Sequence, residues 1–398
     1  MKKVLLLTTA LTMMVATAQA KMFELHVNQP LTGINETRGF DSVIDIFDHY
    51  QDGSLDSIFN AYDDTKGADF VLNFRGIDMN LQYAANNDLT FNVPSIGFTK
   101  TFGDGSGTQK SNFKLFKDYL KENKDGLLRK ILKATVANTP YDMVAGNPNS
   151  LMANMADNTF QRGGGGVLGS FLSYVSPNAS THYFKFNGDE KKASVYSLPI
   201  GKTFKFDNGS KLMFDMPVYY TDMDGSASYS AQAGLAYMFP LIKKDGFKWE
   251  LTPGIRGGAV YSEDMLSGGL LYSGSITSHI SIPVNRITYG LTNMIGYIRD
   301  FSIEAAGYEV DYDLKNTVYK NGISLDYALN DKWSAGAAYS YTFYNGSDLF
   351  IDDYHDLTMS FTRKFREGSL FSGMALVGNY SFDGDDYYAY RLGINFLF

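Results

Sequence analysis

The sequence predicts an all-β fold, a transmembrane antiparallel barrel of about twelve strands, preceded by an N-terminal mixed α+β segment. Three observations predict it. Aromatic residues are abundant, with 28 Tyr and 29 Phe among 398 residues, and many recur at alternate positions in the C-terminal half. Beyond residue 20, no apolar run reaches the roughly 18 residues that a membrane-spanning helix needs. Short and long connections alternate between the predicted strands, as in a barrel whose tight turns all lie at one end.

Composition excludes several classes of function. The chain has no Cys, which rules out disulfides, thiolate metal sites and cysteine nucleophiles. Its formal net charge of −8 argues against a nucleic-acid partner, because such proteins present clustered Lys and Arg. No motif assigns a catalytic, cofactor or metal site, and we expect no enzymatic activity and no cofactor.

Residues 1–20 have the three parts of a secretory signal peptide. Lys2 and Lys3 form the basic start, 4–15 is a short apolar run, and 18–20 reads Ala-Gln-Ala, a small-x-small cleavage site. The apolar run is too short to serve as a membrane-spanning helix. We therefore expect an exported chain that begins near residue 21.

The last twelve residues, 387–398, alternate strictly between two kinds of side chain. One face carries large apolar residues: Tyr388, Tyr390, Leu392, Ile394, Phe396 and Phe398. The other face carries small or polar residues, including Ala389, Arg391, Gly393 and Asn395. This period of two predicts a strand with one face toward lipid and the other toward a wet lumen.

This strand resembles the C-terminal assembly signal of Gram-negative outer-membrane barrels. The residues that carry the resemblance are Arg391, Gly393, Phe396 and the final Phe398. The resemblance implies residence in the outer membrane, with membrane lipid and lipopolysaccharide as surroundings. It also implies assembly by periplasmic chaperones and the barrel-assembly machinery, with Phe398 at the periplasmic side.

Upstream strands follow the same rule in pairs. The predicted strands are 370–382, 333–343, 286–298, 270–282, 210–220 and 193–206, with short turns at 366–369, 330–332, 283–285 and 207–209. Longer connections at 221–226, 262–269, 300–316 and 345–353 separate the pairs. Counting gives eleven strands from residue 193 onward, a short run at 181–186 supplies the twelfth, and the barrel is expected to occupy 179–398. A soluble β-sandwich would also alternate, but the second face here is too polar for a dry core.

Residues 21–178 break this pattern and predict a mixed domain that serves as a plug or lies in the periplasm. Segments 70–85 and 89–102 read as a strand pair, either two more barrel strands, making fourteen, or a hairpin of this domain; we favour twelve. Helices are expected at 113–137 and, with Asn147 as its cap, at 148–160. Weaker helix candidates are 41–50 and 54–62, and the run Gly163 to Gly166 predicts a flexible joint.

The predicted helix 113–137 has one strongly basic face. That face either lies in solvent above a small domain core, or faces acidic side chains in the barrel lumen. In the second case the chain is similar to autotransporter translocators, in which a helix threads a twelve-stranded barrel. Some forty residues separate this helix from the first barrel strand, so the similarity extends to barrel size only.

Candidate lumen residues follow from the strand parity. His279 and Ser281 share a strand face and resemble the His-x-Ser pair of outer-membrane phospholipases. However, neighbouring isoleucines set the outward parity, so both point inward and form a polar lumen pair, away from lipid substrate. Arg391 and Asn395 are expected in the lumen as well.

The functional prediction is a channel or translocation pore, gated by its N-terminal segment. The alternative is a non-conducting structural or adhesin-like barrel that binds partners through its extracellular loops. Small and polar residues at inward positions, such as Ser334, Gly336 and Ser340, favour a wet lumen and the first reading.

Overall fold

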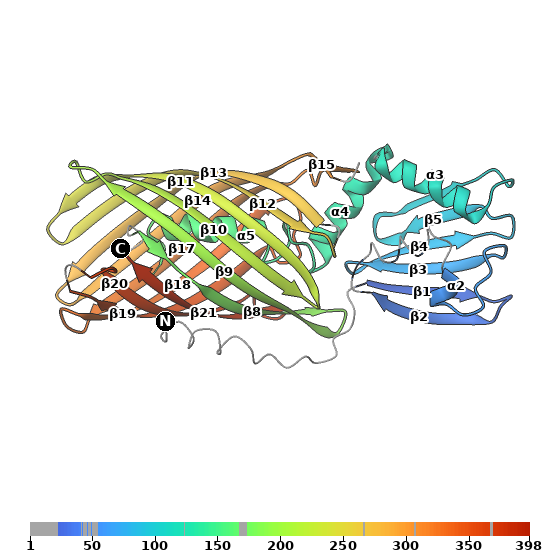
Figure 1. Ribbon diagram of the computed structural model, residues 1–398. Helices are drawn as coiled ribbons and strands as arrows, with labels where there is room; N and C mark the ends of the chain where they lie inside the picture. Colours follow the sequence, from blue (N-terminus) through green and yellow to red (C-terminus); the bar gives the residue numbers. More distant parts are fainter. Residues whose placement is uncertain are drawn as a thin grey trace.

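The structure is a computed structural model that describes residues 23–40, 42, 46, 49, 55–122, 124–166, 173–265, 267–305, 308–366 and 369–398. The predicted signal peptide, 1–20, and most of the helix candidate 41–50 lie outside the described residues. A barrel and an N-terminal sheet domain lie end to end, joined through helices at one barrel mouth (Figure 1).

Twelve antiparallel strands form the barrel, which confirms the predicted number. They are β8 (Asn178–Phe186), β9 (Asp189–Lys205), β10 (Lys211–Met223), β11 (Ser226–Lys244), β12 (Phe247–Ser262), β13 (Ser267–Val284), β14 (Ile287–Phe301), β17 (Lys315–Ala328), β18 (Trp333–Gly346), β19 (Asp353–Lys364), β20 (Gly373–Phe382) and β21 (Tyr387–Leu397). Each strand pairs with the next, and β21 pairs with β8 from Tyr387↔Phe184 to Gly393↔Asn178, which closes the sheet. The two-residue strand β7 (Tyr174–Val175) bridges β9 and β21 beside β8.

The predicted division into short turns at one end and longer connections at the other holds only in part. At the end where Phe398 lies, 245–246 and 285–286 are two-residue turns, but eight residues separate β19 from β20, where a short turn at 366–369 was predicted. At the opposite end, 187–188 and 224–225 are also two-residue turns, so the predicted longer connection at 221–226 is wrong, and the longest connection is the thirteen residues between β14 and β17. We call the two ends the Phe398 end and the far end. The far end also carries a small hairpin, β15 (Ile303–Ala305) and β16 (Tyr308–Val310).

The barrel wall turns its large apolar side chains outward. Leu392, Met359 and Tyr390 are 61%, 72% and 56% exposed, whereas their inward neighbours are small, polar or charged. A soluble protein would bury such a surface, so this arrangement is that of a barrel solvated by lipid. Among the residues that the structure describes, no helix combines the length and apolarity needed to cross a bilayer.

The N-terminal domain is a six-stranded antiparallel sheet with helices on one face. Its strands are β1 (Phe23–Gln29), β2 (Ile34–Phe40), β3 (Ala68–Phe74), β4 (Ile77–Tyr83), β5 (Leu89–Val93) and β6 (Phe98–Phe102), in the order β2-β1-β3-β4-β5-β6. Short helices α2 (Leu55–Ile58) and η1 (Pro94–Ile96) lie between strands. Segments 70–85 and 89–102 therefore belong to this sheet, which excludes the alternative of a fourteen-stranded barrel.

The predicted helix 113–137 is two helices with a break between them. Helix α3 (Gln109–Lys121) begins with a Thr108–Ser111 capping box and packs Phe116 against Phe91 and Phe102 of the sheet. In the turn η2 (Lys124–Gly126), Asp125 and Gly126 adopt the left-handed backbone conformation, which ends the first helix. Helix α4 (Leu127–Asn138) follows. Both helices lie outside the barrel, with α4 at its far end (Figure 1).

Ionic contacts join α4 and the domain to the far mouth. Arg129 and Lys133 of α4 pair with Asp311 and Asp313, which precede β17, at 2.5 and 3.1 Å. Arg75, in the β3–β4 turn, pairs with Asp142 at 2.7 Å, and both side chains are fully buried. The basic face of the predicted helix thus meets acidic barrel residues at the mouth, while a different helix occupies the lumen.

Candidate functional site

The chain passes through the barrel from the far end toward the Phe398 end. At the far end, Val144 packs so closely on the wall that a Cβ at Gly269 would lie 2.9 Å from it. Helix α5 (Leu151–Arg162) follows inside the barrel, and Gly164 then approaches His279 nearer the Phe398 end (Figure 1). The chain next enters β7 and β8, which begin at that same end.

Local sequence explains where α5 begins and ends. The Asn147 side chain donates to the carbonyls of Pro140 and Asp142, which folds the chain back on itself at the mouth. Ser150 has extended backbone, and its hydroxyl accepts from the Ala153 amide as the N-cap. The helix therefore begins three residues later than the predicted range 148–160 and ends two residues beyond it, with Ser150 as the cap in place of Asn147.

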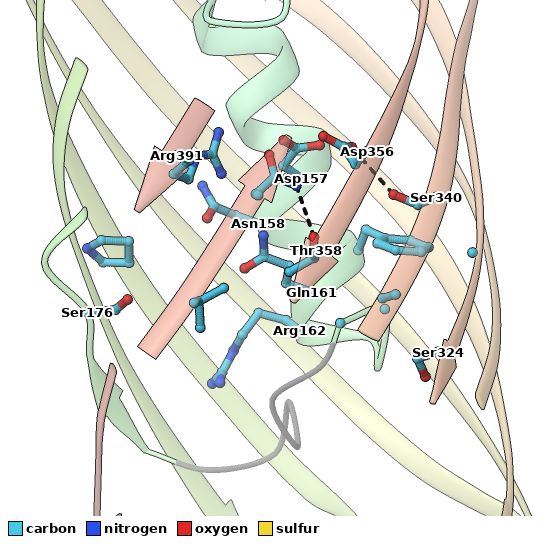
Figure 2. A pocket seen from close by; sticks show the side chains of 18 of the residues that line it. Asp157, Asn158, Gln161, Arg162, Ser176, Ser324, Ser340, Asp356, Thr358 and Arg391 are labelled. Atoms are coloured by element: carbon cyan, nitrogen blue, oxygen red, sulfur yellow. Dashed lines mark hydrogen bonds between the residues drawn. The ribbon is translucent and has the colours of Figure 1, made fainter. Parts of the chain in front are cut away.

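One side of α5 is tied to the wall by a buried charge triad, whose two carboxylates, Asp157 and Asp356, are labelled in Figure 2. The Lys320 ammonium of β17 lies 2.6 Å from Asp157 on the helix and 2.8 Å from Asp356 on β19. The Tyr354 hydroxyl donates to Asp157 at 3.1 Å, and the Ser381 hydroxyl donates to Asp356 at 2.6 Å. The side chains of the triad are 4–12% exposed, so each charge depends on the others for compensation.

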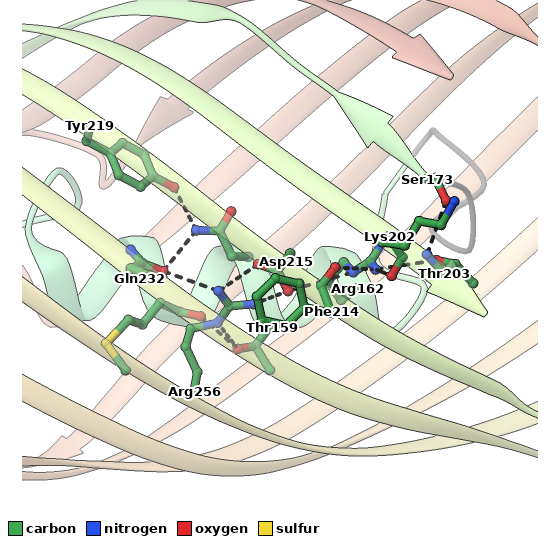
Figure 3. A network of polar contacts seen from close by, with 12 residues as sticks. Thr159, Arg162, Ser173, Lys202, Thr203, Phe214, Asp215, Tyr219, Gln232 and Arg256 are labelled. Atoms are coloured by element: carbon green, nitrogen blue, oxygen red, sulfur yellow. Dashed lines mark hydrogen bonds and ion pairs between the residues drawn. The ribbon is translucent and has the colours of Figure 1, made fainter. Parts of the chain in front are cut away.

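The other side of α5 joins a second polar network (Figure 3). Arg256 of β12 pairs with Asp215 of β10 at 2.7 Å and donates to Thr159 of the helix at 3.1 Å. Asn158 donates to the Tyr219 hydroxyl at 2.6 Å and to the Gln232 side chain at 3.1 Å. Since the helix contacts three separate wall residues here, Arg256, Tyr219 and Gln232, it has one defined position and orientation in the lumen.

The end of the helix is also fixed to the wall. The Arg162 guanidinium donates to the carbonyls of Lys202 and Phe214 at 3.1 and 3.3 Å and lies 3.7 Å from Asp215. A Cβ at Gly164 would lie 2.5 Å from His279, so only a glycine fits between the chain and the wall there. This close approach accounts for the run of glycines, which the sequence suggested as a flexible joint.

A polar cavity of about 160 Å³ remains between α5 and the wall from β17 to β21 (Figure 2). Its lining includes Gln161, Asn178, Thr358 and Asn379 besides the charged residues above. The volume holds several water molecules, but far less than a solute-conducting channel of the porin type. In this state the lumen is occupied mainly by the chain's own helix.

The structure places the four predicted lumen residues on the inner face. Arg391 and Asn395 of β21 line the cavity, and the His279 ring accepts or donates at Nδ1 with the Thr292 hydroxyl at 2.8 Å. Ser281 shares the inward parity of His279 on β13. The sequence reasoning missed the residues that hold the helix, namely Asp157, Asn158, Asp215, Arg256, Lys320 and Asp356. Their signal was a charge at an inward position in mid-strand, such as Lys320.

Of the four predicted assembly-signal residues, Arg391, Gly393 and Phe396 lie on β21, and Phe398 follows directly after its last residue. Phe396 and Phe398 each lie 5.1 Å from the Phe371 ring, centroid to centroid, at the Phe398 end. Gly393 faces Asn178 of β8, so closely that any side chain there would overlap the Asn178 amide. Within the described residues, no group of three or more His, Asp and Glu side chains is arranged to hold a metal ion.

Comparison with known proteins gives structural likenesses and no sequence relatives. No protein-family model and no curated protein matches the chain. The translocator domain of the autotransporter NalP from Neisseria meningitidis is 13% identical, with a TM-score of 0.43, over 62% of this chain and 96% of that one. An outer-membrane channel from Pseudomonas putida F1 is 9% identical, with a TM-score of 0.42, over 57% of this chain and 96% of that one. The transport unit of the autotransporter AIDA-I from Escherichia coli is 10% identical, with a TM-score of 0.39, over 57% and 90%.

Proposed function

We propose that this chain is an outer-membrane translocation pore for its own N-terminal domain, which it then displays at the far mouth. The observation that carries the proposal is the path of the chain. Residues 144–164 follow the lumen, the N-terminal domain lies at the far end, and the first barrel strands begin at the Phe398 end. In a membrane, that path places the domain and Phe398 on opposite sides.

The dimensions of the lumen support passage of an unfolded segment. One α-helix with its side chains measures about 10–12 Å across, and α5 leaves only the small cavity beside it. The six-stranded sheet is about 24 Å wide at the usual strand spacing, and is therefore too wide for that lumen. The domain would cross unfolded, fold at the far mouth, and be held there by α4 and the Arg75–Asp142 pair.

Because α5 fills the lumen, the proposed translocation pore differs from a passive channel, whose lumen is open. The triad around Lys320 and the network around Arg256 fix α5 in place, so permeation of solutes would first require α5 to leave. Gating by the N-terminal segment in this sense is part of the proposal. Export through a signal peptide, assembly by chaperones and the barrel-assembly machinery, and contact with lipid and lipopolysaccharide belong to it as well.

Planar-bilayer conductance tests the closure. The chain refolded from residues 21–398 is expected to insert and remain silent, whereas a chain beginning at Ser173, which lacks the domain and α5, is expected to conduct. Heat-modifiable migration on gels without boiling shows that both have folded as barrels. Steady conductance by the longer chain, at the level of the shorter one, would contradict a lumen closed by α5.

A further inference from the structure

The Phe398 end of the barrel is ringed by exposed cations. The exposed Lys and Arg side chains at this end are Lys202, Lys205, Lys243, Lys244, Lys248, Arg286, Lys332, Arg363, Lys364 and Arg366. We call them the basic collar. In the described part of the chain, none of these ten forms an ion pair, and the connections at that end expose only Asp207, Asp245 and Asp331 as carboxylates.

The far end has the opposite charge. Its connections, 187–188, 224–225, 263–266, 302–314, 347–352 and 383–386, contain twelve Asp and Glu and no Lys or Arg, although Lys185, Lys191, Lys192, Arg299 and Lys315 lie at the adjoining strand ends. The two ends of the barrel therefore carry charges of opposite sign. Several of the far-end carboxylates already have partners, such as Asp311 with Arg129 and Asp313 with Lys133. Among the described residues, no carboxylate pairs with the collar in this way.

The position of the collar on the wall indicates what it meets. Lys202 shares the outward face of β9 with Ile200 and Phe204, which are 42% and 51% exposed. Arg363 is outward on β19, and its guanidinium lies 5.1 Å from the centre of the Trp333 ring. Cations that alternate with lipid-facing apolar residues lie at the level of the headgroups, where their alkyl stems contact hydrocarbon and their charges reach water.

We propose that the basic collar binds anionic phospholipid headgroups in the leaflet that surrounds the Phe398 end. The inference rests on the barrel's residence in a membrane, but not on the direction or occurrence of translocation. Each Lys or Arg near an anionic bilayer surface strengthens association by about fivefold, and salt weakens it within a Debye length. The collar would anchor the barrel's depth and tilt through these headgroups.

Both tryptophans of the chain, Trp249 and Trp333, begin strands at this end and report on adjacent lipid. The experiment reconstitutes the full chain from residue 21 in bilayers that contain brominated phosphatidylglycerol or brominated phosphatidylcholine, and measures quenching of Trp fluorescence. Competition between brominated and unlabelled lipids gives their relative affinity. We expect phosphatidylglycerol to be preferred by about threefold to fivefold at low salt. This preference should vanish in about 0.5 M salt.

Matched variants test the assignment. Replacing Lys202, Lys244 and Arg363, which share the outward face with lipid-facing residues, by Gln is expected to abolish most of the preference, whereas K185Q with R299Q, at the far end, is expected to leave it unchanged. Equal quenching by both lipids in the unaltered protein would overturn the proposal while still showing a barrel in lipid. Absence of quenching by either lipid would instead contradict the membrane barrel itself. Lysine-dependent sedimentation with purified peptidoglycan, without lipid preference, would assign the collar to that polymer and exclude the lipid.

Discussion

Among the residues that face the lumen, we expect replacement of Lys320 to lower the free energy of unfolding most. Its ammonium compensates two buried carboxylates, Asp157 and Asp356, which no other group contacts at ion-pair distance in the described residues. K320M leaves both buried carboxylates with no cation at ion-pair distance, and we expect a loss of about 3–5 kcal/mol of unfolding free energy. Urea unfolding of the refolded protein in detergent measures it.

Two further variants make that prediction specific. K332M removes an exposed lysine from a turn at the Phe398 end and should change stability by less than about 0.5 kcal/mol. Adding D157N and D356N to K320M removes the uncompensated charges and should recover much of the loss. Equal destabilisation by K320M and K332M would show that the triad does not hold α5.

The contact of Asp313 with α4 predicts a dependence on pH. Hydrogen bonds from Lys315 and Lys133 lower the pKa of Asp313 to about 2, below its usual value of 3.8. A depressed pKa stabilises the contact above the unfolded value, and this stabilisation is lost as pH falls from about 4 through about 2. The protection of α4 amides from hydrogen exchange, measured relative to the intrinsic exchange rate at each pH, should fall across that window in the unaltered chain. The D313N variant should exchange faster at pH 5 and show no such step; an identical step in D313N would contradict the assignment.

At this scale, strand parity predicts which side chains face inward but not what they bind. Alternation alone put His279, Ser281, Arg391 and Asn395 on the inner face, where the structure has them. The Asp157–Lys320 contact joins residues 163 positions apart, and it depends on the depth and rotation of a helix within the barrel. No periodicity of either segment contains that information.

Among the elements, the segment after α5 has the tightest fit. Gly164 has a φ of +115°, and a Cβ there would lie 2.5 Å from His279. G164A should therefore destabilise the seated segment by about 1–3 kcal/mol. Limited proteolysis of residues 139–166 in the refolded chain measures the loss of protection. The matched control is G166A, where the nearest atom, of Gln161, is 4.0 Å from the new Cβ; equal protection in both variants would contradict the tight fit.

The strand β21 carries a prediction on assembly. Phe398 is 47% exposed and packs its ring on Phe371 at the membrane-facing edge. F398S should lower the amount of chain inserted in the outer membrane and leave periplasmic aggregates, measured by membrane fractionation. The control is S369A, an exposed turn residue at the same end. Normal membrane yield of F398S would contradict the assembly role of this residue.

The helices show where sequence patterns stop being sufficient. The apolar spacing of 113–137 predicts a helix correctly, but Asp125 and Gly126 adopt φ of 57° and 63° and split it in two. Helix α5 was expected at 148–160, but nothing in its sequence places Asn154, Asp157 and Asn158 inside a barrel. Those residues are buried because the barrel wall supplies their partners, and only the folded barrel reveals this.

For the whole molecule, the barrel was more predictable than the path of the chain. Alternating aromatics and the phase of the turns depend on local residues, so they give twelve strands and their directions. Whether 21–178 lies in, under or beyond the lumen depends on which mouth the domain meets. That is decided by contacts such as Arg75–Asp142 and Arg129–Asp311, which have no local signature.

The most direct test of the central claim is the labelling of single cysteines in intact cells, which the cysteine-free chain makes unambiguous. Leu31, which is 75% exposed in the N-terminal domain, and Asp331, in a turn at the Phe398 end, are each replaced by Cys. A membrane-impermeant maleimide should label L31C in intact cells, and D331C only after the outer membrane is permeabilised. Labelling of D331C but not L31C in intact cells would place the N-terminal domain in the periplasm and contradict its translocation through the barrel.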